Sequence, residues 1–125
     1  MPISNYLETN FINASVRNTA YTPPATVYIA LYSTAPTEST AGVELTGNGY
    51  SRQSVVFAAP TATGSVSSSI VTFGPATADW ATINATAVVD AATGGNILYY
   101  QPKTAVVKSG DTVEIAAGDI LVNMT

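Results

Sequence analysis

Short strand-like segments recur along this chain at intervals of roughly ten residues, and they constrain its fold more than any other feature. Each combines β-branched and aromatic side chains, and turns rich in Gly, Pro, Asp or small residues separate one segment from the next. The predicted strands span residues 25–33, 50–58, 66–73, 83–90, 96–101, 105–108, 112–116 and 120–124. This succession predicts an all-β fold, either an antiparallel β-sandwich or a jelly-roll-like barrel.

A short helix is predicted ahead of the strands, over residues 4–17. Apolar side chains recur there at helical spacing, at Ile3, Leu7, Phe11 and Ala14. Asn5 and Glu8 resemble a capping pair at the start of this helix, and tandem prolines at positions 23 and 24 prevent its continuation. Residues 34–49 are predicted to be a long surface loop, and residues 76–82 a helical turn or loop.

The length of 125 residues fits one domain. Within it we expect an N-terminal helical segment, residues 1–20, followed by a β-sandwich, residues 21–125. Only 10% of the residues are charged, against roughly 25% in typical soluble domains. Because small proteins normally keep apart through surface charge, a charge-poor surface indicates that part of it is covered in an assembly.

The composition also excludes several classes of function. The chain has no cysteine and no histidine, which removes thiolate nucleophiles, Cys/His zinc sites and imidazole acid-base catalysis. A net charge of −4 opposes binding to nucleic acid. No apolar run is long enough to cross a bilayer, and no basic leader precedes an apolar core, so we expect synthesis in the cytoplasm without a signal peptide and no membrane partner. We expect no enzyme activity, cofactor or metal.

The acidic residues offer little for catalysis. Glu38 and Glu44 lie in the predicted loop 34–49, where they either bind a cation together or are solvated separately, and the second interpretation is favoured. Asp90, Asp111 and Asp119 border glycine-containing turns, where an aspartate normally bonds the local backbone.

Arg52 is one of only four basic residues, and it lies on the predicted strand 50–58. A guanidinium in this position can pair with a carboxylate, stack on a tyrosine or bridge to a neighbouring subunit. We interpret it as a structural or interface residue and not as a catalytic one.

Two tyrosine pairs stand out, Tyr28 with Tyr32 and Tyr99 with Tyr100. Packing between sheets or against another subunit is the favoured interpretation, and a platform for sugars or bases is the alternative.

Six segments together resemble a family of small tailed-phage virion proteins, and the likeness covers nearly the whole chain. They read SNYLE, TPPATVYIALYSTAPTE, GNGYSRQSVVF, VTFGPATADWATI, VVDAATGGNILYY and SGDTVEIAAGDI. Proteins of this family are often labelled phage tail fibre protein, and they are similar to capsid decoration (cement) proteins. The resemblance implies no catalytic residues.

The expected function is that of a virion structural protein. The leading form is a capsid decoration protein that binds and stabilises the major capsid protein lattice, as a homotrimer and with other small virion proteins as possible neighbours. The first alternative is a tail fibre or baseplate component that contacts the host, and the second is a carbohydrate-binding module. The corresponding location is the capsid surface or, alternatively, the tail.

Docking is expected through strand edges, the loop 34–49 and the N-terminal segment, so that removal of residues 1–8 would abolish particle binding and leave the sandwich folded. The candidate interface residues are Tyr6, Leu7, Phe11, Tyr28, Tyr32, Glu38, Glu44, Arg52, Tyr99 and Tyr100.

Overall fold

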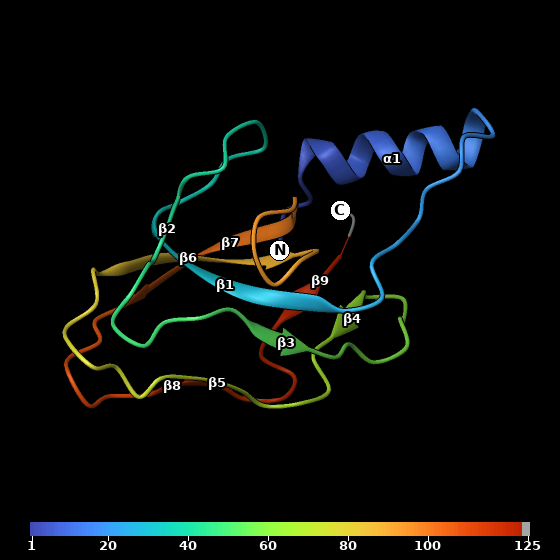
Figure 1. Ribbon diagram of the computed structural model, residues 1–125. Coiled ribbons are helices and arrows are strands. Elements are labelled where there is room, and N and C mark those ends of the chain that lie inside the picture. The colour runs from blue at the N-terminus through green and yellow to red at the C-terminus, as the bar shows by residue number, and fades with distance from the viewer. Residues whose placement is uncertain (124–125) are drawn as a thin grey trace.

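The computed structural model describes residues 1–123, and it contains one N-terminal helix followed by nine strands in antiparallel sheets (Figure 1). This confirms the predicted all-β sandwich with a short helix. The elements are α1 (Asn5–Val16), β1 (Val27–Thr34), β2 (Val43–Glu44), β3 (Gln53–Val55), β4 (Ser65–Val66), β5 (Val71–Phe73), β6 (Ile83–Val89), β7 (Ile97–Ala105), β8 (Val113–Ile115) and β9 (Leu121–Val122). No helix among the described residues is long and apolar enough to span a membrane.

The larger sheet is built around β1. Its strand order is β2-β1-β6-β7, and β3 pairs with β1 on the same side as β2. One side of β1 is paired with β6, whereas the other side is divided, because β3 pairs with Val27–Ile29 and β2 with the end of the strand from Tyr32 onward. A gap in strand pairing therefore lies between β2 and β3, opposite the middle of β1.

Both faces of the larger sheet are covered, as the sequence predicted for the first strand. Ile29, Leu31 and Val88 point from one face into the main core, which they share with residues of the smaller sheets such as Phe73. On the other face, small side chains such as Ala30 lie in a second cluster beneath tyrosines. Alternate side chains of β1 thus pack into two different hydrophobic clusters, one on each face of the sheet.

Two short pairs, β4 with β9 and β5 with β8, form the opposing layer. The single strand predicted over residues 66–73 is wrong, because this segment leaves one pair at β4 and enters the other at β5. Ser67 lies at the transition, and its buried hydroxyl accepts hydrogen bonds from the N–H groups of Gly118 and Ile120. The polar side chain holds the turn before β9, and the strand changes partner there.

Other predicted boundaries shift for physical reasons. β7 is one long strand that runs through Pro102, in place of two predicted strands at 96–101 and 105–108. A proline is tolerated there because β7 is at the edge of the sheet and donates no ladder bond on its open side. The loop predicted at 34–49 contains β2, and the strand predicted at 50–58 is reduced to β3. The strand predicted at 120–124 is confirmed as β9, with its last predicted residue, Met124, outside the described residues.

The helix has the predicted bounds but a different cap. The side chain of Ser4, and not the pair Asn5 and Glu8, accepts the hydrogen bond from the Leu7 N–H at 3.3 Å. Leu7 is buried in the main core, whereas Ala14, predicted to share its face, is exposed. The helix is therefore anchored to the sandwich through Leu7 in its first turn and through the half-buried Phe11.

Candidate functional site at Arg52

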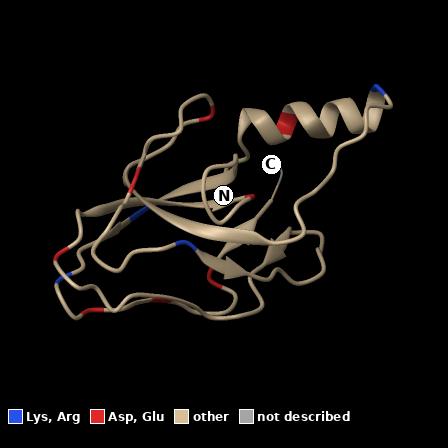
Figure 2. Ribbon diagram, viewed as in Figure 1, with Lys and Arg blue, Asp and Glu red and all other residues tan. Residues whose placement is uncertain are grey.

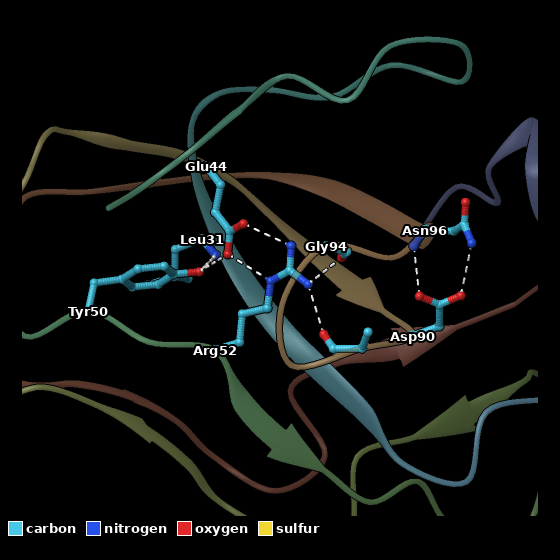
Figure 3. A network of polar contacts seen from close by, with 8 residues as sticks. Leu31, Glu44, Tyr50, Arg52, Asp90, Gly94 and Asn96 are labelled. Atoms are coloured by element: carbon cyan, nitrogen blue, oxygen red, sulfur yellow. Dashed lines mark hydrogen bonds and ion pairs between the residues drawn. The ribbon is translucent and has the colours of Figure 1, made fainter. Parts of the chain in front are cut away.

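Arg52 lies just before β3, beside the gap between β2 and β3, and its guanidinium joins three separate segments (Figure 3). It donates from Nε and Nη2 to the two carboxylate oxygens of Glu44 on β2, at 2.9 and 2.8 Å. It also donates from Nη1 to the carbonyl oxygens of Ala91 and Gly94 in the β6–β7 turn, each at 2.8 Å. The arrangement is a bidentate ion pair, and the Nη1 group of the same guanidinium binds the β6–β7 hairpin turn.

Tyr50 completes the cluster by filling the gap in strand pairing. Its hydroxyl donates to Glu44 at 2.6 Å and accepts the Leu31 N–H at 3.0 Å, a backbone donor of β1 that neither β2 nor β3 reaches. Its ring is stacked on Phe73, with centroids 6.1 Å apart, and meets Trp80 edge-on at 5.7 Å. Tyr50 thus connects the polar cluster to the main core.

The electrostatics of this cluster stabilise the ion pair. Burial alone would raise the pKa of Glu44, but hydrogen bonds from Arg52 and Tyr50 outweigh it, so the Glu44 carboxyl titrates below its usual range. The hydrogen bond to Glu44 raises the pKa of Arg52 further. Burial and the adjacent Glu44 carboxylate both raise the pKa of Tyr50. All three groups therefore hold their neutral-pH charge states firmly.

The contacts of this cluster cross-link the fold. The Arg52 side chain is 10% exposed and that of Glu44 25%, and both Glu44 oxygens are occupied by donors. Glu38 does not join Glu44, as the cation-binding interpretation required; it lies near the start of α1, where its carbonyl oxygen accepts the Asn5 N–H. Within residues 1–123, no three or more acidic side chains gather as a metal site would need.

The turn aspartates follow the favoured interpretation in two of three cases. Asp90 accepts from the backbone and side-chain nitrogens of Asn96 across the β6–β7 turn, as Figure 3 shows. Asp111 accepts the Lys108 N–H. For Asp119, only its backbone takes part in the hydrogen bonds of its turn among the described residues.

The tyrosines are packing residues in this structure. Tyr32 is only 3% exposed, and Tyr28 and Tyr100 pack beside it on the outer face of the larger sheet. Tyr99 points to the opposite face and packs against the main core. Tyr99 and Tyr100 therefore cannot form one stacking platform.

The N-terminal candidates occupy three different environments. Leu7 is in the main core, Phe11 is half-buried against the edge of the Tyr21 ring at 5.9 Å, and Tyr6 is 40% exposed. No partner chain is present, so the interface roles of all ten candidate residues stay predictions.

The sequence interpretation named Arg52 and Glu44 but missed the partners that make them a cluster. Tyr50 was treated as a strand residue, and nothing in its neighbourhood indicated that its hydroxyl would reach Leu31, nineteen positions earlier. The available signal was the turn at Gly47-Asn48-Gly49, where all three residues have positive φ. Such a turn ends extended pairing before Tyr50 and lets its side chain enter the gap.

Comparison with known proteins places the chain in a phage family. No curated protein matches it. A family profile described as podophage GP4 fiber I protein gp80 matches residues 2–123, almost the full length. The resemblance to small tailed-phage virion proteins is thereby confirmed, and the chain belongs to the podophage GP4 fiber I protein gp80 family.

Proposed function

We propose that this protein is a non-enzymatic structural subunit of a tailed-phage virion, located in a fibre. The family description names a fibre protein, which favours the tail alternative over the capsid surface. A fibre subunit needs a stable fold and contacts with its neighbours, and it needs no reactive centre. Both requirements fit this chain.

The observation that carries the proposal is the use of the Arg52 cluster. Four of the five N–H donors of Arg52 and both carboxylate oxygens of Glu44 are used in hydrogen bonds within the fold. A catalytic or ligand-binding arginine would be expected to keep most of its donors for a substrate. Here the ion pair closes the divided edge of β1, which supports a structural role.

The surface supports a role in assembly. Figure 2 shows few charged residues along the ribbon, with long uncharged stretches of chain between many of them. Large apolar side chains are exposed at several positions, among them Val56 just after β3 at 62% and Ile70 just before β5 at 57%. We propose that neighbouring copies, arranged as a homotrimer, and other small virion proteins cover part of this surface.

A second candidate is a capsid decoration protein bound to the major capsid protein. The favouring observation is the single short sandwich, which has no repeated or elongated section within residues 1–123 that would itself form a shaft. A compact module of this kind can bind at repeated positions on a capsid lattice as well as form one part of a fibre. The carbohydrate-binding alternative has less support, because Tyr32 is buried and the other tyrosines of the two pairs, Tyr28, Tyr99 and Tyr100, are engaged in packing.

Labelling of intact virions tests the proposal. Gold-conjugated antibodies raised against the purified protein would be imaged on negatively stained particles. The proposal expects gold confined to fibres, at a few positions per particle. Gold distributed over the whole head would instead establish the decoration role and refute the fibre location.

A further inference from the structure

Residues 2–4 act as an additional strand on the edge of β7. Ile3 is bridged to Tyr99 in antiparallel fashion. Around this pair, the Ser4 N–H donates to the Leu98 carbonyl at 2.9 Å, and the Tyr100 N–H donates to the Pro2 carbonyl at 3.1 Å. The segment is thus held by the same main-chain bonds that a peptide makes when it adds to a sheet edge.

The two halves of β7 differ in side-chain character, and the N-terminal segment pairs with only one of them. The half under residues 2–4 carries apolar and aromatic side chains, Leu98 to Tyr100. The half beyond it carries Pro102 and Lys103, residues that discourage strand addition. Without a paired segment, the first half of β7 would be an unpaired apolar strand edge that promotes aggregation. This part of β7 therefore requires an N-terminal segment, from its own chain or from another.

The contacts of the N-terminal segment with the main core reach Phe11, in the middle of α1, and are not seen for the apolar residues after it. Leu7 is buried, but Ile12 is 58% exposed and Val16 75%, one helical turn apart on one side of α1. In Figure 1 the second half of α1 extends beyond the sheets, and the chain then returns to β1. In this half of the helix Phe11 packs against the main core and Tyr21, whereas the apolar side chains of Ile12 and Val16 are left exposed.

A hinge follows the helix. Asn18 has a φ of 53°, in the left-handed region, and the chain reverses its direction there. Residues 17–20 are exposed, and the segment continues to β1 as an extended stretch with tandem prolines. The nine residues 18–26 span up to about 30 Å when straightened, enough to carry the helix to a neighbouring molecule.

We propose that residues 1–17 are an exchangeable arm, and that in the assembled protein the arm of one copy covers the β7 edge of a second copy. Exchange remakes the same hydrogen bonds and the same Leu7 contact in the partner, so the changes are confined to the hinge, where Tyr21 leaves its place against the main core and Phe11. Glu8 and Arg17 are the only charged side chains of the arm and hinge, and their charges are opposite, so these side chains add no net charge to the contact.

The chain whose arm covers the β7 edge is a second copy of this protein, because the sequence of residues 1–7 is matched to that edge. The register of Ile3 on Tyr99, the Ser4 hydroxyl bound to the Ile97 carbonyl and the Leu7 pocket are all matched to residues 1–7. The exchange also brings a neighbour to the exposed side of α1. The inference deepens the proposed role as a virion structural subunit and rests on it, but it concerns purified protein and is tested without particles.

Disulfide trapping distinguishes an exchanged arm from a closed one. The bonds flanking Ile3 and Tyr99 make them a non-hydrogen-bonded pair, whose short Cα separation suits a disulfide. The chain has no cysteine of its own, so the double variant Ile3→Cys/Tyr99→Cys contains only the two new thiols. It would be oxidised at the concentration where the protein is assembled and run on a non-reducing denaturing gel, with native mass recorded beside it.

The proposal expects covalent dimers and higher species whose 3–99 disulfide joins two chains, proved by peptide mapping of mixed heavy- and light-isotope protein. Covalent monomers alone, or a monomeric native mass at every concentration, would overturn it. Neither result depends on where the protein lies in the virion.

A hinge variant provides a second test that leaves the arm and its edge unaltered. Asn18→Gly favours the left-handed turn of the closed form, whereas Asn18→Ala disfavours it. We expect the assembly constant to rise roughly fivefold from the glycine to the alanine variant. Equal constants, or the reverse order, in analytical ultracentrifugation would refute the hinge role.

Discussion

Replacement of Arg52 by alanine should destabilise the fold by about 2–3 kcal/mol. The substitution removes two bonds to Glu44 and two to backbone carbonyl oxygens. Stranding one partner of a fully buried pair costs roughly 3–5 kcal/mol. The Glu44 side chain is 25% exposed, so water can solvate part of the stranded carboxylate and the cost falls below that range. A loss of this size is a large fraction of the stability of a small domain.

The assay is urea unfolding followed through Trp80, the single tryptophan, which lies 5.7 Å from the Tyr50 ring. The matched control is Lys108→Ala, which removes the other ion pair of the structure, a 3.6 Å contact to Asp79 with side chains 67% and 61% exposed. An exposed pair of this kind is worth about 0–1 kcal/mol.

Arg52→Lys refines the test, because it keeps the charge but loses the planar fork, and we expect it to fall between wild type and Arg52→Ala. The reasoning is refuted if Arg52→Ala loses no more free energy of unfolding than Lys108→Ala. A variant with unchanged unfolding but reduced native mass would place Arg52 in a subunit contact instead, as the sequence interpretation also allowed.

Three further perturbations address the same region. Wild type should be more stable than Glu44→Gln, and this difference in free energy of unfolding should be full above roughly pH 4.3. It should shrink as the pH falls through the lowered pKa of Glu44, because the unfolded chain takes up the proton first. Equal differences at pH 7 and pH 3 would contradict this. Tyr50→Phe keeps the stacked ring but leaves the Glu44 carboxylate and a β1 amide without the hydroxyl, and should cost about 1–2 kcal/mol in the urea assay. Gly49→Ala should cost more than Gly47→Ala, since a Cβ at Gly49 would meet a carbonyl oxygen at 2.8 Å whereas nothing lies within 4 Å at Gly47, and equal midpoints would argue against that crowding.

Much of the fold was predictable because local patterns determine it. The alternation in residues 25–33 predicted a strand with two covered faces, and β1 has them. The helix bounds were predicted from spacing and from the prolines after it. The strand at 66–73 failed, since a buried serine that binds a distant turn looks in sequence like a polar strand residue.

The candidate site was predictable only in part, because its partners are set by tertiary structure. Arg52 and Glu44 were both identified, but their pairing depends on β2, a two-residue strand that the sequence pattern did not indicate. The N-terminal segment was expected to be free for docking, with residues 1–8 dispensable for folding. Instead, Ile3 pairs with β7 and Leu7 lies in the core, so their removal should destabilise the sandwich.

The most direct test of the fibre role is the number of copies of this protein per virion, measured by quantitative mass spectrometry against the major capsid protein. The account predicts a small fixed number per particle, far below that of the capsid protein. A ratio near one, or a simple fraction of one, would show that the protein follows the capsid lattice and would contradict the fibre assignment.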